Sequence, residues 1–163
     1  MLFTESIVVG SKDLSARVYY RVNSKNMATS ILSGHRDVLI GGYFSSDSNR
    51  IYTIAADGAV FIWEFEEKER IHIEQNINEN NLTKRGSTWN LSKREFLWDP
   101  HTHVSSSGYL KTAELLVVGF DNGVFGIYDM PDCTNIHRLS VSSHSLSTVA
   151  INCTGDWLAL VSL

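Results

Sequence analysis

The chain has 163 residues, a mass of 18.3 kDa and a hydrophobic fraction of 43%, which is enough for one modest domain with a packed core. Its 14 Lys and Arg residues stand against 18 Asp and Glu residues, so the net charge is −4. A protein whose whole surface grips nucleic acid is usually basic. This charge balance therefore argues against a dedicated nucleic-acid binder, and any RNA contact would have to be local.

Neither the cysteines nor the first residues indicate export. Cys133 and Cys153 have no CxxC spacing and form no disulfide framework, which suits a reducing compartment. Polar residues follow Met1-Leu2-Phe3 at once, so the basic and apolar regions of a signal peptide are missing. No apolar run approaches the roughly 18 residues of a membrane span. We expect a soluble, intracellular protein without a membrane partner.

The apolar residues fall in short β-rich runs rather than at helical spacing. In chain order the predicted strands cover residues 6–10, 16–20, 51–54, 59–63, 115–119, 124–128 and 157–161. Turn signals join them in pairs, at Lys12-Asp13, Asp57-Gly58 and Asp121-Asn122-Gly123. Asp-Gly and Asn-Gly supply the positive φ angles of tight hairpin turns. The sequence therefore predicts an all-β fold of antiparallel hairpins in series.

The hairpins are repeats, because an aromatic residue ends the second strand of each hairpin at the same position relative to its turn: Tyr19, Trp63 and Tyr128. Tyr19 and Trp63 are 44 residues apart, which lies within the period of roughly 40–45 residues typical of WD40 units. Trp63 and Tyr128 are 65 residues apart. The excess coincides with residues 66–85, a run of charged and amide side chains that cannot bury a core. We interpret this run as a polar loop inserted between two blades.

One unit resembles a complete WD40 repeat, with Gly34-His35 as its GH dipeptide and Trp63-Glu64 in the place of its WD dipeptide. The resemblance implies a structural tetrad of His35, Thr53, Asp57 and Trp63 joined in one hydrogen-bonded chain. Such a network satisfies buried polar groups and locks a blade. A His near an Asp and a Thr also fits a catalytic triad, but the Trp partner and the repeat register already explain these residues.

The predicted organisation is a WD40 β-propeller fragment with two whole blades and two partial blades. The expected segments are a partial blade at 1–22, a blade at 27–65, the inserted loop at 66–85, a blade at 89–129 and a partial blade at 135–163. Propellers close with four to eight four-stranded blades. Two whole and two partial blades cannot close a ring, so we expect this chain to be part of a longer protein.

Several stretches resemble one family of WD-repeat proteins, the periodic tryptophan protein 2 family. They are VVGSKDLSARV at 8–18, SGHRD at 33–37, LVVGFDNGVF at 116–125, DMPD at 129–132 and STVAINCTGDWLA at 147–159. The resemblance covers nearly the whole chain apart from the insert, and it implies a place in the later blades of the first of the family's tandem propellers.

The same resemblance implies a function. It points to a non-enzymatic scaffold in the UTP-B subcomplex of the small-subunit processome, which acts in pre-rRNA processing and small ribosomal subunit assembly in the nucleolus. The expected partners are the other UTP-B subunits, with pre-rRNA and small nucleolar RNA in the same particle. No cofactor, metal or small-molecule substrate is expected. The alternative is a generic WD40 protein-interaction platform in another nuclear or cytoplasmic complex.

Two further hypotheses come from the residues themselves. In Asp99-Pro100-His101-Thr102-His103, two histidines at i and i+2 of an extended chain share a side and could hold a metal, although no third ligand stands at motif spacing. The pairs Lys84-Arg85 and Lys93-Arg94, interleaved with Trp89 and Trp98, could bind RNA by phosphate contact and base stacking. The simpler interpretations are solvated loop histidines and a solvated strand edge with its aromatics in the core.

Overall fold

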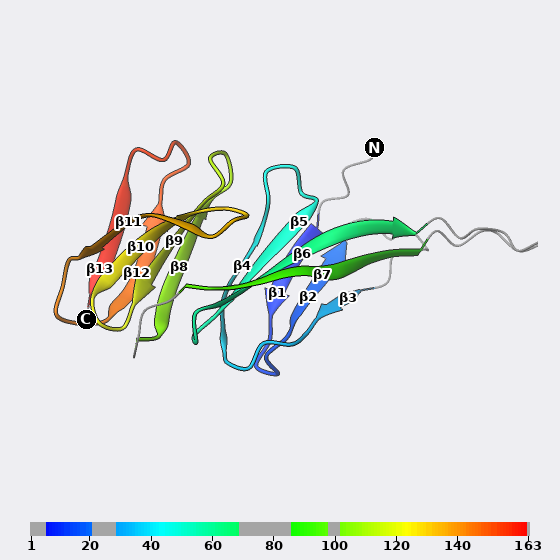
Figure 1. The fold of residues 1–163 in the computed structure, drawn as a ribbon, viewed down its shortest axis with the longest axis horizontal. Coiled ribbons are helices and arrows are strands. Elements are labelled where there is room, and N and C mark those ends of the chain that lie inside the picture. The colour runs from blue at the N-terminus through cyan, green and yellow to red at the C-terminus, as the bar shows by residue number, and fades with distance from the viewer. Residues whose placement is uncertain (1–5, 21–28, 69–85, 98–101, 163) are drawn as a thin grey trace, which may run out of the picture.

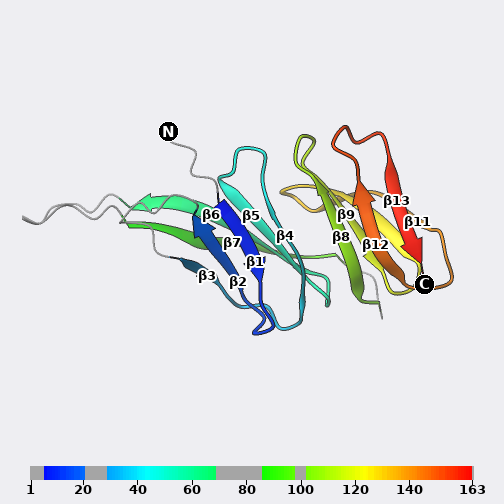
Figure 2. The same cartoon turned by 180° about the vertical axis from the view of Figure 1, so that it is seen from behind.

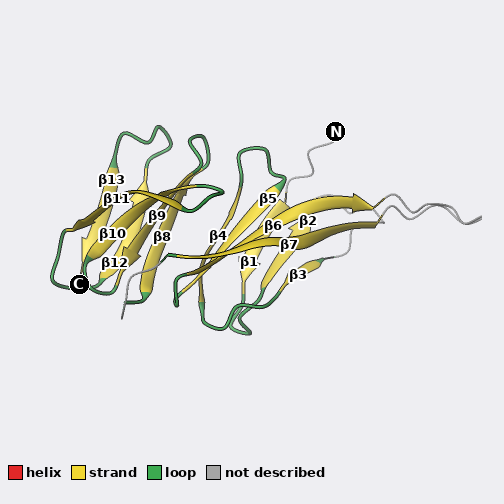
Figure 3. Ribbon diagram, in the orientation of Figure 1, coloured by secondary structure: helices red, strands yellow, loops and turns green. Residues whose placement is uncertain are grey.

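The computed structural model describes residues 6–20, 29–68, 86–97 and 102–162, in which all regular structure is β-strand (Figure 3). The prediction of an all-β fold is confirmed. In the same ranges, no helix offers the length and apolar character needed to cross a membrane. The strands are β1 (Ser6–Gly10), β2 (Ala16–Tyr20), β3 (Ser30–Leu32), β4 (Leu39–Phe44), β5 (Arg50–Ala55), β6 (Ala59–Lys68), β7 (Gly86–Phe96), β8 (Val104–Leu110), β9 (Leu115–Phe120), β10 (Val124–Asp129), β11 (Thr134–Ser140), β12 (Leu146–Ile151) and β13 (Leu158–Ser162).

The strands form four antiparallel sheets that follow one another along the chain (Figure 1). The first sheet contains β1–β3, the second β4–β7, the third β8–β11 and the fourth β12 and β13. Within each sheet every strand pairs with its neighbour in sequence. Figure 2 shows the same succession from behind. This series of meandering sheets is the blade arrangement of WD40 β-propellers.

The sheets pack face to face through three apolar layers. Between the first and second sheets lie Ala16, Val18, Leu32, Ile51, Ala59, Phe61, Trp63 and Trp89. Between the second and third lie Tyr52, Ile54, Val60, Ile62, Leu97, Val104, Leu116, Val118, Phe120, Tyr128 and Met130. Between the third and fourth lie Val117, Phe125, Leu146 and Val149.

Strand β5 shows why the inner strands are apolar on both faces. Successive side chains of a strand point to opposite sides, so Ile51 enters the layer toward the first sheet while Tyr52 and Ile54 enter the layer toward the third. All three are 0% exposed. Burying a side chain of this size stabilises the fold by roughly 1.5–3 kcal/mol, and β5 therefore contributes to two interfaces at once.

The sheets and the repeating units of the sequence are offset by one strand. β7 begins just before the predicted blade at 89–129, yet it pairs with β6, with Phe65 opposite Trp89 and Lys68 opposite Gly86. Glu66 begins the predicted insert but continues β6. The polar segment therefore joins two paired strands of one sheet, and the prediction that it separates two blades is wrong. Its residues 69–85 lie outside the described ranges.

Candidate functional site

The predicted tetrad begins as a buried hydrogen-bonded chain in the second sheet. His35 precedes β4, Thr53 lies on β5 and Trp63 on β6. The Trp63 indole Nε1–H donates to Thr53 Oγ1 at 2.9 Å, and His35 Nε2 lies 2.7 Å from the same oxygen. His35 is 7% exposed, Thr53 1% and Trp63 5%. One hydroxyl thus ties the loop entering the sheet to two of its strands.

Asp57 does not complete the chain as the repeat pattern predicts. Its carboxylate Oδ1 accepts the Ala59 amide at 3.0 Å, within the turn between β5 and β6. His35 Nδ1 is buried and has no hydrogen-bond partner. The structure therefore brings together three of the four predicted residues. Asp57 stabilises its own turn, where an Asx side chain readily binds an amide two residues further on.

One aromatic side chain covers the histidine and a cationic one lies over that aromatic ring. The Phe61 ring stacks on the His35 ring with centroids 3.9 Å apart, and the Arg94 guanidinium carbon lies 5.1 Å from the Phe61 centroid. Burial lowers the pKa of His35 to about 4, with Asp57 opposing the shift and Arg94 adding to it. His35 is therefore neutral at pH 7.

This geometry supports a structural role for the network. A catalytic triad needs a nucleophile that a substrate can reach, and the Thr53 hydroxyl is closed off inside the sheet with the indole bound to it. The carboxylate that would orient the histidine is occupied by a turn amide. The arrangement can fix three segments of the sheet, but it presents no reactive atom to solvent.

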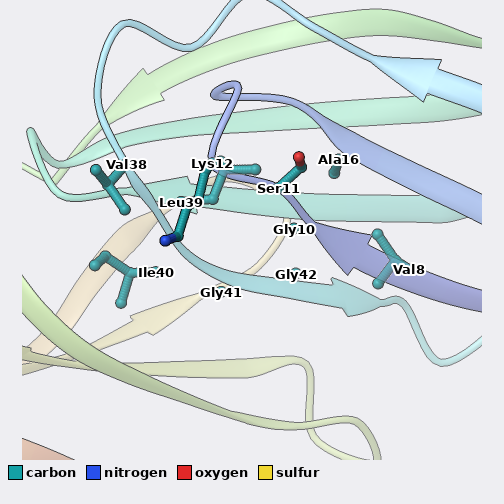
Figure 4. A pocket seen from close by; sticks show the side chains of 10 residues that line it. All are labelled: Val8, Gly10, Ser11, Lys12, Ala16, Val38, Leu39, Ile40, Gly41 and Gly42. Atoms are coloured by element: carbon teal, nitrogen blue, oxygen red, sulfur yellow. The ribbon is translucent and has the colours of Figure 1, made fainter.

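A groove of about 380 Å³ lies between the edge strands β1 and β4 (Figure 4). Val8 and the turn residue Lys12 stand along one side, and Leu39 and the backbone of Gly41 and Gly42 along the other. Its ten lining residues include no Asp, Glu, His or Cys. The groove therefore combines apolar walls with a single amine.

The basic and aromatic residues proposed for RNA are partly committed to protein contacts. Trp89 is 8% exposed and its indole N–H donates to the Tyr20 hydroxyl at 2.9 Å, so it offers no free face for base stacking. Lys93 Nζ lies 2.9 Å from Glu95 and 3.8 Å from Asp132. Arg94 lies on Phe61. Lys84, Arg85 and Trp98 lie outside the described residues.

The metal hypothesis falls mainly on residues whose placement is not described. Asp99, Pro100 and His101 lie outside the described ranges. His103 Nδ1 is 3.4 Å from Asp121 Oδ2 on the following turn. Across the described parts of the chain, no group of three His, Cys, Asp or Glu side chains is placed to hold a metal ion.

Comparison with known proteins identifies the family. The chain is 37% identical over 161 residues to periodic tryptophan protein 2 of Saccharomyces cerevisiae, in an alignment with 94% of this chain and 17% of the yeast protein. The homologue from Neurospora crassa is 36% identical over 152 residues, with 93% of this chain and 16% of the homologue. The Schizosaccharomyces pombe homologue is 33% identical, with 92% of this chain and 17% of the homologue. The chain belongs to the periodic tryptophan protein 2 family. No protein-family model matches it.

The chain spans 16–17% of the length of these fungal relatives. A mouse homologue is also similar, at 29% identity over 191 residues. The resemblance predicted from the five sequence stretches is thus confirmed over nearly the whole chain. In these fungal relatives, the matching segment is one part of a considerably longer protein.

Sequence reasoning missed two features of this chain. The stack of Arg94, Phe61 and His35 depends on the pairing of β7 with β6, which places Arg94 opposite Phe61. The groove beside Gly41 and Gly42 depends on how the first sheet meets the second. The adjacent glycines were a usable signal for the groove, because glycine in a strand often marks a close approach of another backbone.

Proposed function

We propose that this chain acts as a non-enzymatic scaffold segment in the UTP-B subcomplex of the small-subunit processome, within the later blades of the first propeller of its protein. Its role would be to hold protein subunits during pre-rRNA processing and small ribosomal subunit assembly. The observation that carries the proposal is membership of the periodic tryptophan protein 2 family over 94% of the chain. The processome role and nucleolar location come from the resemblance to that family.

The structure supports a binding role over a catalytic one through the placement of its polar groups. The His35, Thr53 and Trp63 side chains are at most 7% exposed, and His35 Nε2 and Trp63 Nε1 both bond to Thr53 Oγ1. Rigid sheets with short turns are suited to present several surfaces at fixed angles. In this proposal the partners are proteins first, and pre-rRNA and small nucleolar RNA are held in the same particle.

The test is affinity purification of the tagged protein from cells of its source, followed by mass spectrometry and RNA sequencing. We expect UTP-B subunits to copurify with and without ribonuclease, because protein contacts would hold the subcomplex. Small nucleolar RNA and pre-rRNA should copurify only without ribonuclease, and the tagged protein should lie in the nucleolus. Copurification with a different complex would support a generic WD40 platform and refute the processome proposal.

Direct RNA contact is tested separately by ultraviolet crosslinking with peptide mapping. Crosslinks on the peptide that contains Lys93 and Arg94 would place RNA on the outer strand β7. Crosslinks confined to other subunits would show that the chain meets RNA only through its partners. Substituting both residues by Gln would then leave RNA copurification unchanged.

A further inference from the structure

A half-buried carboxylate, Glu114, bonds across the junction between the second and third sheets. Glu114 lies at the end of the turn between β8 and β9, and its side chain reaches across to the second sheet. Its Oε1 accepts the backbone amide of Ser46 at 2.6 Å, in the turn between β4 and β5. Its Oε2 accepts the hydroxyl of Tyr52 at 3.1 Å and also the hydroxyl of Tyr109. One side chain thus binds donors from three different elements.

The surroundings hold this carboxylate in place. Glu114 has a φ of 53°, in the left-handed region, and its carbonyl accepts the Met130 amide at 2.9 Å. The rings of Tyr52 and Tyr109 meet edge to face with centroids 5.6 Å apart. A second link beside it joins Lys111 Nζ to Ser48 Oγ at 3.1 Å. The two turns therefore contact each other at two points.

We propose that Glu114 is a carboxylate clasp that fixes the second sheet against the third and positions their adjacent turns as one edge. Each of its three partners donates a hydrogen, which suits a carboxylate because it only accepts. Hydrogen bonds to a charged acceptor contribute more than neutral ones, particularly in a partly buried site. Glu114 is a positioning residue here, since it bonds across the junction and not within the strand ladder of either sheet.

The tyrosines remain donors under all ordinary conditions. Burial, reinforced by the adjacent Glu114 charge, raises the pKa of Tyr52 well above its usual range. Burial and the hydrogen bond to Glu114 raise the pKa of Tyr109 in the same way. Near neutral pH both hydroxyls therefore remain protonated and can donate to Glu114.

The main test is the substitution Glu114→Gln in the full chain, with Glu95→Gln as the matched control. Glu95 is a carboxylate of β7 that forms an ion pair with Lys93 and is not among the groups that bond Ser46, Tyr52 or Tyr109. Hydrogen exchange measured by NMR should show the Ser46 amide exchanging at least about tenfold faster in E114Q, because a charged acceptor is lost. The unfolding equilibrium constant should rise by about tenfold as well. E95Q should leave Ser46 exchange unchanged.

A second pair of variants keeps the test decisive if E114Q does not fold. Tyr109→Phe removes one hydroxyl from the clasp, whereas Tyr43→Phe removes a hydroxyl that bridges the same junction to Ser107 at 2.9 Å without touching Glu114. Y109F should accelerate Ser46 exchange more than Y43F does. Where E114Q folds, the E114Q and Y109F effects should be non-additive, as expected for groups in direct contact. Equal Ser46 exchange in E114Q and E95Q, or in Y109F and Y43F, would overturn the proposal.

Discussion

Acidification should destabilise the fold through His35, and the size of the effect follows from its burial. The folded protein holds this imidazole neutral with a pKa of about 4, against an ordinary value of 6.5. Between pH 6.5 and about pH 4 the imidazole is protonated in the unfolded chain but neutral in the folded protein. The free energy of unfolding therefore decreases as pH falls through this range. The loss is about 2 kcal/mol at pH 5 and approaches about 3 kcal/mol near pH 4, at 1.36 kcal/mol for each pKa unit.

The assay is urea denaturation of the parent and of His35→Gln at pH 7.5, 6 and 5. Glutamine cannot be protonated, so the variant should lose about 2 kcal/mol less than the parent between pH 7.5 and pH 5. His144→Gln serves as the control, because His144 is an exposed histidine in the turn before β12, and this variant should follow the parent. Parallel pH curves for H35Q and the parent would refute the assignment of acid sensitivity to His35.

Three further outcomes follow from the same contacts. Thr53→Val should lower the free energy of unfolding in urea by about 3 kcal/mol, because two buried partners lose their shared oxygen; a loss under 1 kcal/mol would contradict this. Gly58→Ala should lower the free energy of unfolding, followed by a thermal melt, by about 2 kcal/mol, because Gly58 has a φ of +83° and an added Cβ would lie 2.8 Å from the Leu97 carbonyl oxygen. In the control Gly10→Ala the added Cβ meets only ordinary contacts, so this change should be nearly neutral. Replacing residues 69–85 by a two-residue Asn-Gly turn should change stability by less than about 1 kcal/mol, because the flanking ends of β6 and β7 already pair; a large drop in melting temperature would show that the segment packs.

The strands that could be predicted from sequence are those with short apolar runs, and β5, β6, β9 and β10 among them are buried on at least one face. The runs at 6–10 and 16–20 coincide with β1 and β2, and those at 115–119 and 124–128 match β9 and β10 to within one residue at their ends. Burial requires apolar side chains, and apolar side chains in short runs are what a sequence displays most clearly. The hairpin turns were also predictable, because Gly58 and Gly123 take the positive φ angles that the turns demand.

The outer strands and one tetrad contact could not be predicted. β11 is exposed at each of its seven residues, so its fold does not require apolar side chains at regular positions. β7 carries charges at Lys93, Arg94 and Glu95, which resemble loop sequence until their pairing with β6 is known. The missing link from Asp57 to His35 depends on side-chain direction, and the spacing of residue types leaves that direction open.

The offset between sheets and sequence units has a practical consequence for dividing the gene. A truncation after Phe65 would follow the sequence repeat, yet it would remove β7 and the end of β6 from the second sheet and leave the rest of β6 unpaired on that side. The freed strand would then present unpaired backbone groups and invite aggregation. A cut after Leu97 would instead retain the whole second sheet. A boundary should therefore be placed after the last strand of a sheet and not after a sequence repeat. This applies to truncations for expression, to inserted reporters and to segments exchanged between relatives.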